Sequence, residues 1–306
     1  MPDRIAQTKI LLVGPGRAGR AFARSWTGAG GSVVLVARDT AAARTFAADI
    51  PRAEVRDLDG RRTLSGDVLV LSVPDDAIHP LAERIGGRVA CQFAFHFSGA
   101  LGSRELAPLS SAGASLGSLH PLRAFSGAAT DTWESAFVGV EGDEPAVLIG
   151  EQLCRHAGAH PHRVAAADKP LYHAAATIAA GGAASLLSFA SRLWVAAGLS
   201  EEEGRTALAE LASGAVDAVE RLPFDRALTG PVARRDIETV RLHREALRSW
   251  PEHSALYALL ASETLRRTPG RGHEDEIERI LRPDAKTAGP GSLSNAKESD
   301  IRRRKG

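Results

Sequence analysis

The sequence predicts an α/β protein in which a doubly wound, mostly parallel sheet is followed by an all-helical domain. Three observations support this fold class. A glycine-rich turn follows an apolar run near the N-terminus, and strand-like runs then alternate with helical or loop segments as far as about residue 165. Beyond that point only helical patterns remain. A chain of 306 residues is long enough for both domains.

The glycine turn follows the apolar run Lys9–Val13 and has the spacing G-x-G-x-x-G between residues 14 and 19. Glycines allow a tight strand-to-helix turn in which backbone N–H groups approach a pyrophosphate at a helix N-terminus. A helix at 18–26 and a second apolar run at 32–37 complete a strand–helix–strand unit. The cofactor contacts expected here are Gly14, Gly16, Arg17, Ala18 and Gly19.

The residue that follows the second strand indicates which of the two nicotinamide dinucleotides, NAD or NADP, is bound. An acid there accepts a hydrogen bond from the ribose 2′-OH of NAD, whereas an arginine suits the 2′-phosphate of NADP. This chain has Arg38, with Arg44 further on, so NADP is favoured, and Asp39 leaves NAD open. A third strand, at 67–73, ends in further expected cofactor contacts, Val73, Pro74 and Asp75.

Composition limits the classes of partner. The net charge of +1 gives no argument for binding nucleic acid or an acidic membrane. Cys91 and Cys154 lack C-x-x-C spacing, which indicates a reducing compartment, and no apolar signal region precedes the first strand, so we expect a cytoplasmic protein. Residues 174–191 carry no charge but are mostly Ala, Gly and Ser, which favours a helix buried in a domain core or between subunits over a membrane span.

The remaining pattern defines the expected domains. Further strands are predicted at 88–97, 115–122, 137–140 and 160–164, and helices at 169–197, 200–221 and 233–265. We expect a dinucleotide-binding domain over 1–165, a helical substrate and dimerisation domain over 166–267, and a disordered tail over 268–306 that has room for a short helix at 274–281.

Polar residues at the carboxyl ends of strands are the first catalytic candidates, because ligands of open α/β sheets bind there. His120 and His96 could supply the proton that reduction of a C=O or C=N bond requires, and Ser98 could donate to a developing oxyanion. For each histidine the alternative is a buried imidazole satisfied by the backbone. His156, His160 and His162 have no adjacent acidic partner, so no metal site is expected.

Lys169 stands out because the chain has 33 arginines and only five lysines. It begins the helical region, just ahead of His173, and could donate to a substrate oxygen; the alternative is a solvated residue. Asp236, Thr239 and His243 would share one helix face, which makes Asp236 another catalytic candidate. An anionic small-molecule substrate would be bound by Arg123, Arg234 or Arg235.

These motifs resemble a family that pairs a Rossmann-like domain with domain of unknown function 2520, itself similar to pyrroline-5-carboxylate reductases, 6-phosphogluconate dehydrogenases and other β-hydroxyacid dehydrogenases. The resemblance covers about residues 9 to 265. The segments that carry it are the glycine turn, Ser72–Asp76, His96–Gly99, Leu119–Leu122 with Phe125 and Ser126, Tyr172–Ala176, and Leu228–Pro231 with Asp236, Thr239, Val240 and His243.

The resemblance implies an NADP-dependent or NAD-dependent oxidoreductase, a helical domain like the C-terminal domain of 6-phosphogluconate dehydrogenase, and a homodimer built through that domain. His120-Pro121 is similar to an element of prephenate dehydrogenases, in which the histidine contacts the reacting hydroxyl and a serine assists; Ser98 would be that serine. Two departures stand out. An expected Asn is replaced by Gly181 or Gly182, and an expected Arg-Gly-Asp reads Arg234-Arg235-Asp236.

Two functions are therefore open. The first is reduction of a small ketone, keto acid or imine by hydride transfer from NADPH, with proton transfer assisted by His120. The second is a dinucleotide-binding redox sensor or scaffold without turnover, since a fold alone does not establish chemistry. A sensor would not need His120, Ser98 and Lys169 to converge beside the cofactor.

Overall fold

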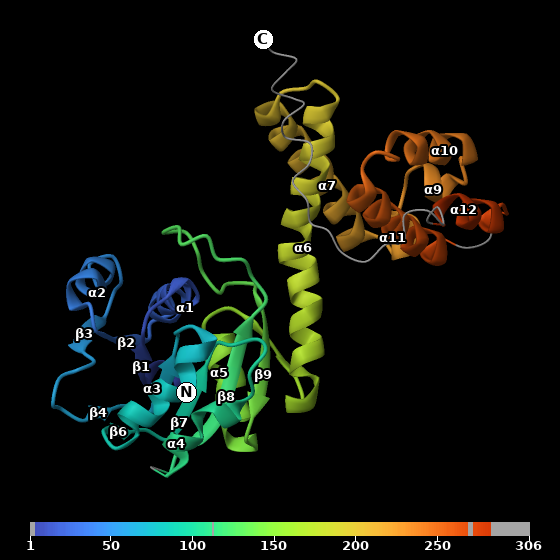
Figure 1. The fold of residues 1–306 in the computed structure, drawn as a ribbon. Helices are drawn as coiled ribbons and strands as arrows, with labels where there is room; N and C mark the ends of the chain where they lie inside the picture. Colours follow the sequence, from blue (N-terminus) through green and yellow to red (C-terminus); the bar gives the residue numbers. More distant parts are fainter. Residues whose placement is uncertain (1–3, 112, 269–271, 283–306) are drawn as a thin grey trace. The chain divides into compact units, whose positions relative to one another are not determined.

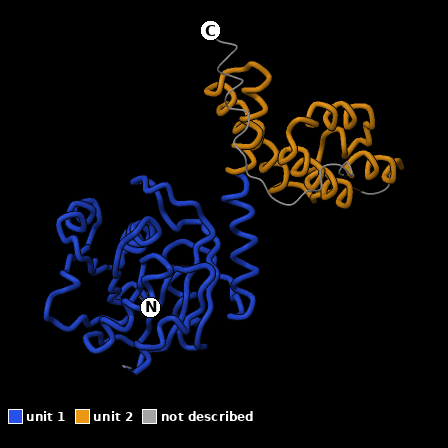
Figure 2. Tube along the Cα trace, viewed as in Figure 1, with its two compact units in different colours: residues 1–183 blue, residues 184–306 orange. Residues whose placement is uncertain are grey.

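The structure is a computed structural model that describes residues 4–111, 113–268 and 272–282 (Figure 1). The chain forms two compact units that divide between Ala183 and Ala184 (Figure 2). The first unit contains the sheet and the first half of helix α6 (Lys169–Ala196). The second contains the rest of α6 and the helices that follow.

The first unit is built on an eight-stranded sheet with the order β10-β9-β8-β7-β5-β1-β2-β3. All neighbouring strands are parallel except β8 and β9. The strands are β1 (Lys9–Val13), β2 (Ser32–Ala37), β3 (Ala53–Asp57), β5 (Val68–Leu71), β7 (Phe93–His96), β8 (Ser115–Pro121), β9 (Phe137–Gly142) and β10 (His160–Arg163); β4 (Leu64–Ser65) and β6 (Val89–Ala90) pair separately. The predicted α/β class is confirmed.

Helices cover both faces of this sheet, which explains why its central strands are apolar throughout. In β1, Ile10 and Leu12 join one buried apolar cluster, and Leu11 and Val13 join the other. The first cluster receives side chains from α1 (Arg17–Gly28), α2 (Thr40–Ala47) and α5 (Glu144–His156); the second receives them from α3 (Asp75–Gly86) and α4 (Ala107–Ser110). Three-residue or four-residue 3₁₀ helices lie at Arg4–Gln7, Ser103–Leu106 and Ala166–Asp168.

The second unit is helical, as predicted, but the expected helix at 233–265 is wrong. In place of that single helix the chain forms three, α9 (Pro231–Arg234), α10 (Ile237–Ala246) and α11 (Pro251–Arg267). They follow α7 (Glu201–Arg221) and α8 (Phe224–Ala227). The first break occurs at Arg235, whose φ of 61° lies in the left-handed region. Asp236 then caps α10 by accepting from Thr239 N at 3.1 Å, and Pro251 starts α11, as proline often does.

Helix α12 (Glu274–Leu281) lies in the segment that we expected to be a disordered tail. It has the bounds of the short helix considered there, and it buries Ile277 and Leu281 against Val240 and Leu265. Apolar burial of this kind orders a segment that composition alone leaves undecided. The remainder of the predicted tail, from residue 283, lies outside the described residues.

Helix α6 is not buried in a domain core, so that part of the expectation is wrong. Leu171 is 76% exposed and Ile178 is 74% exposed. Within the described residues, one helix, spanning 166–196, is long and apolar enough to cross a membrane, with a mean hydropathy of 1.4. The first residue of α6, Lys169, is nevertheless buried against the sheet, and the first compact unit runs to Ala183, beyond the boundary expected at 165.

Candidate functional site: a glycine-turn cavity and a lysine–histidine cluster

The glycine turn is held against the end of β5 so closely that side chains are excluded. Gly14 has φ +67°, and a Cβ there would lie 2.4 Å from Val73 Cγ1. A Cβ on Gly19 would lie 2.5 Å from Ser72 Oγ. Both positions therefore need glycine, because the backbone conformation and the close approach leave no room for a larger residue.

The helix that follows this turn has an uncapped N-terminus. Its N-cap, Gly16, offers no side-chain hydrogen bond, and its first turn, which contains Arg17 and Ala18, has no acidic residue. The first N–H groups of a helix lack partners within the helix, and the helix dipole favours an anion there. The start of α1 is thus suited to a pyrophosphate, as the spacing of the glycines indicates.

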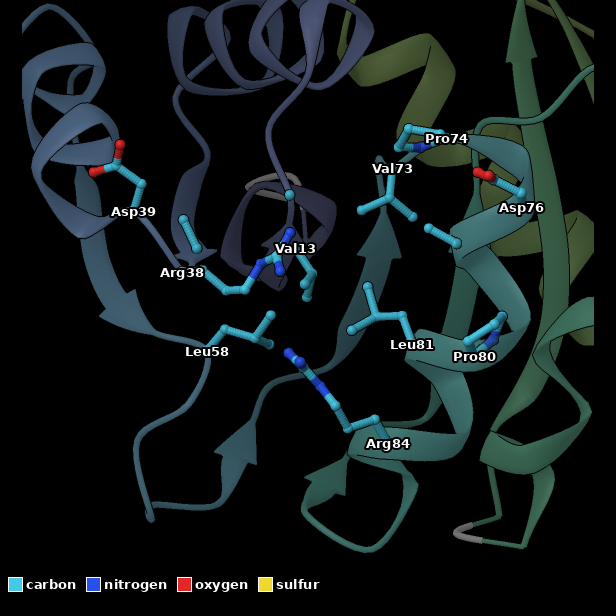
Figure 3. A pocket seen from close by; sticks show the side chains of 13 residues that line it. Val13, Arg38, Asp39, Leu58, Val73, Pro74, Asp76, Pro80, Leu81 and Arg84 are labelled. Carbon is cyan, nitrogen blue, oxygen red and sulfur yellow. The ribbon is translucent and has the colours of Figure 1, made fainter.

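Next to the turn lies a cavity of about 730 Å³ (Figure 3). Five of the predicted cofactor contacts line it, namely Gly14, Arg38, Asp39, Val73 and Pro74. The other six do not, namely Gly16, Arg17, Ala18, Gly19, Arg44 and Asp75, although Asp76 does. Sequence reasoning missed the residues that α3 and the loop after β3 contribute to the cavity: Leu58, Pro80, Leu81 and Arg84. Arg84 comes from the last turn of α3.

Arg38 and Asp39, which directly follow β2, differ in whether the side chain already has a hydrogen-bond partner in the protein. Asp39 is the N-cap of α2, and its Oδ1 accepts from Ala42 N at 2.9 Å. In Figure 3 its carboxylate points toward α2, whereas the side chain of Arg38 extends into the cavity. Arg38 is therefore better placed than Asp39 to meet a ligand.

A second group of polar side chains gathers where α6 begins, within the first unit. His120, in β8, has its Nδ1 3.1 Å from the hydroxyl of Tyr172, and that hydroxyl also donates to the carbonyl of His120 at 3.3 Å. The two contacts fix the orientation of the imidazole. Tyr172 was not among the predicted site residues, although it lies one helical turn after Lys169, and that spacing was the available signal.

His173 packs against the same imidazole. The rings of His120 and His173 are 5.4 Å apart and nearly perpendicular. Gly99 allows this arrangement, because a Cβ at that position would lie 2.4 Å from His173 Cδ2 and 2.7 Å from His120 Nε2. The predicted candidates His120 and His173 are therefore brought together by a glycine at the carboxyl end of β7.

Lys169 is buried, with 2% of its surface exposed, and begins a chain of hydrogen bonds that leads away from the cluster. Its Nζ donates to Ser98 O at 3.1 Å and to Ser118 Oγ at 2.8 Å. Ser118 Oγ donates to Glu141 Oε2 at 2.9 Å, and both carboxylate oxygens of Glu141 accept from Ser103. Ser118 and Glu141 face each other across β8 and β9. Lys169 thus has a buried carboxylate as its counter-charge.

Sequence reasoning missed Glu141 and Ser118. The one signal was an acid in the otherwise apolar strand Phe137–Gly142.

Ser98 and His96 are fully engaged within the protein. Ser98 Oγ donates to Asp75 Oδ2 at 2.8 Å and accepts from Leu101 N at 3.0 Å, so its one proton is already used. His96 Nδ1 accepts from Ser98 N at 3.1 Å, and its Nε2 donates to Gly102 O at 3.0 Å. Both nitrogens of His96 therefore hold the turn that carries Ser98. His96 is thus a buried imidazole satisfied by the backbone, which was the alternative to a catalytic role.

Burial sets the charges of the cluster at neutral pH. Desolvation lowers the pKa of His120 to about 4, with His173 and Lys169 acting in the same direction and Asp75 opposing them. Desolvation also lowers the pKa of Lys169 to about 8, while Glu141 and Asp75 oppose this shift. His120 is thus neutral at pH 7 and Lys169 is mostly protonated, which makes Lys169 the stronger proton donor.

The remaining predicted residues are engaged elsewhere. Asp236 accepts from Thr239, and His243 contacts the hydroxyl of Tyr257 at 3.1 Å, all within the second unit. Arg123 donates to the carbonyls of Thr132 and Glu134, and the buried Arg235 donates to Thr268 and Glu274. Among the described residues there is no group of three or more His, Cys, Asp or Glu side chains that could hold a metal ion.

An uncapped glycine turn at the carboxyl edge of a doubly wound parallel sheet defines the class of this molecule, which is a Rossmann-fold protein. The comparison of sequences agrees. Residues 3–121 match the Rossmann-like domain, and residues 136–264 match the domain of unknown function DUF2520. The resemblance that the motifs indicated is therefore confirmed, and the chain carries these two domains in that order. No curated protein matches the sequence.

Solved structures share this fold. Protein TM1727 from Thermotoga maritima is 23% identical, with a TM-score of 0.69, and the alignment covers 85% of this chain and 98% of that one. A Bacteroides fragilis protein that carries the provisional name NADP oxidoreductase is 19% identical, with a TM-score of 0.67 and coverage of 85% and 98%. The pyrroline carboxylate reductase of Plasmodium falciparum, with NADP bound, is 11% identical, with a TM-score of 0.56 and coverage of 90% and 99%. At these identities the likeness concerns the fold.

Proposed function

We propose that this protein is a reductase that transfers hydride from a nicotinamide dinucleotide, preferentially NADPH, to a small ketone, keto acid or imine. The observation that carries the proposal is the link between the cavity wall and the polar cluster. Asp75 directly follows the cavity residues Val73 and Pro74, and it accepts a hydrogen bond from Ser98, whose carbonyl accepts from Lys169. A cofactor in the cavity would thus run toward Lys169 and His120.

In this proposal the bound dinucleotide supplies the hydride, and the protein supplies the proton and the orientation. Lys169 donates a proton to the reduced oxygen or nitrogen, since an ammonium with a pKa of about 8 is protonated yet acidic enough to react near neutrality. When the hydroxyl of Tyr172 turns to donate to Nδ1, neutral His120 carries its proton on Nε2, and in that tautomer it polarises the acceptor by a hydrogen bond. His96 and Ser98 do not react; their hydrogen bonds hold the turn that follows β7 in place. An anionic substrate, such as a keto acid, suits the ammonium of Lys169.

The preference for NADP rests on Arg38, which lines the cavity and ends β2. The competing acid, Asp39, already uses one carboxylate oxygen to cap α2. NAD remains the alternative cofactor.

The proposal predicts tight NADPH binding and substrate-dependent NADPH oxidation. Titration with NADPH and with NADH can be followed by tryptophan fluorescence, because Trp26 and Trp133 are buried in the first unit. A screen of keto acids and cyclic imines, with the matching esters as uncharged controls, then measures turnover. Equal affinity for NADH would remove the argument from Arg38. Tight binding without turnover of any compound would favour the redox sensor or scaffold instead.

We further propose a soluble, cytoplasmic homodimer that is formed through α6 and the second unit. Its support is the set of large apolar side chains that these helices leave exposed. The residues concerned are Leu171, Ile178, Leu186, Val195, Leu199, Leu211, Val216 and Val219. A Cβ at Gly181 would meet nothing within 4 Å, and a Cβ at Gly182 would lie 3.8 Å from Thr177 O, so these small residues leave room for a second helix.

Replacing Ile178 with glutamate is expected to convert this dimer to a monomer, because each copy would bury a charge in the interface. Sedimentation velocity over a range of protein concentrations measures the change. Glu202→Gln, on the exposed start of α7, is the matched control and should stay dimeric. A monomeric wild-type protein would contradict the proposal.

A further inference from the structure

Arg84 brings a second guanidinium group to the cavity beside the glycine turn. It lies in the last turn of α3, and it lines the cavity together with Leu81 and Pro80 of the same helix. Arg38 reaches the same cavity from the end of β2. In Figure 3 both side chains extend into the cavity, Arg38 from the side of β2 and Arg84 from α3, with Leu58 beside them.

The two acids that line the cavity, Asp39 and Asp76, do not neutralise the guanidinium groups of Arg38 and Arg84. Asp39 points toward α2 and accepts from its backbone. Asp76 lies at the opposite end of α3 from Arg84, which at 1.5 Å of helix rise per residue is about 12 Å away along the axis. Arg84 forms an ion pair with Asp59, which is 3.3 Å away and does not line the cavity, and both side chains are about half exposed. An exposed pair of this kind is weak, so an entering anion can displace it.

We propose that Arg84 and Arg38 form a two-arginine clamp for the 2′-phosphate of the dinucleotide. This inference rests on the proposed function. A phosphomonoester carries nearly two negative charges at neutral pH, and arginine binds phosphate through paired N–H donors, so two guanidinium groups on opposite sides match it in charge and geometry. The apolar side chains of Leu58 and Leu81, which line the same cavity, suit the adenine ring.

The test is Arg84→Gln, studied by titration with NADP⁺ and NAD⁺. We expect the Kd for NADP⁺ to rise about tenfold or more, since a charge-assisted contact is lost, while the Kd for NAD⁺ changes less than about twofold. 2′-AMP and 5′-AMP used as minimal probes should show the same difference. Arg84→Lys, which keeps the charge, should recover part of the affinity. Arg104→Gln is the matched control, because Arg104 is exposed and does not line the cavity.

Other results would overturn the clamp. An equal rise in Kd for NADP⁺ and NAD⁺ would assign Arg84 to the adenine ring or to the fold, and an unchanged Kd for NADP⁺ would remove it from the site. These readouts need no turnover, so they can fail while the proposed reductase activity stands. If the wild-type protein binds neither dinucleotide, the proposed function fails together with the clamp.

Discussion

Replacing Glu141 with glutamine is expected to lower the free energy of unfolding by about 3 kcal/mol at pH 7. The variant leaves the buried ammonium of Lys169 without its counter-charge, while Ser103, which donates to both carboxylate oxygens, then faces an amide group. Removing one member of a buried charge pair costs about 3–5 kcal/mol, and we place this pair at the low end because the hydroxyl of Ser118 separates the charges. Urea denaturation at a fixed protein concentration measures the loss.

The matched control is the double variant Lys169→Met with Glu141→Gln. If the unpaired ammonium causes the loss, removing it as well should restore most of the stability, whereas two unrelated defects would add. Lys169→Met alone should cost less than Glu141→Gln, because the Glu141 carboxylate that it leaves behind still accepts three hydrogen bonds from Ser103 and Ser118. A double variant as unstable as the sum of the single variants would contradict the pairing.

The pH dependence gives a second measure of the same pair. The pKa of Lys169 is about 8 in the fold and 10.5 ordinarily, so between these values the unfolded chain binds more protons and the free energy of unfolding rises with pH. The gain across this window is about 3 kcal/mol. Burial raises the pKa of Cys91 from 9.0 to about 11, which acts in the opposite direction above pH 9. The comparison is therefore made against Lys169→Met, in which only the lysine contribution is absent.

The sequence predicted best the features whose causes are local. The glycine turn and the runs around it were predictable because strand, turn and helix follow one another along the chain, and Gly14 needs its conformation whatever lies further away. The break between α9 and α10 was missed because a left-handed conformation at a non-glycine residue, Arg235, leaves no mark in the pattern. The break before α11 did have a signal in the sequence, Pro251, which the prediction of one continuous helix overlooked.

The cluster was only partly predictable, because its contacts depend on register. Lys169 was singled out by its rarity, yet its counter-charge, Glu141, meets it only because β9 runs antiparallel to β8 and sets Glu141 opposite Ser118. Likewise, Arg84 belongs to the cavity because of the way α3 packs on one face of the sheet, which no sequence spacing specifies. His120 was the preferred histidine in the sequence and His96 remained a candidate; their hydrogen bonds then distinguish the two.

Replacing His120 with alanine is expected to leave the affinity for NADPH nearly unchanged and to lower turnover by about 10² to 10⁴-fold. His120 does not line the dinucleotide cavity, so cofactor binding should persist, whereas the hydrogen bond to the reacting atom would be lost. Steady-state rates with the substrate found by the screen give the result, and thermal unfolding confirms that the variant folds. Tyr172→Phe should cause a smaller loss, because it removes only the group that orients the ring.

The pH profile then separates His120 from Lys169 as the proton donor. With His120 at a pKa of about 4 and Lys169 at about 8, donation by Lys169 predicts a rate constant kcat/KM that is steady near neutrality and falls above about pH 8. Donation by His120 predicts a fall that begins near pH 4. Because arginine stays protonated, the fall near pH 8 should disappear in Lys169→Arg, whatever its absolute rate. Unchanged turnover in His120→Ala would remove His120 from the reaction, and a break at pH 8 that survives in Lys169→Arg would remove Lys169.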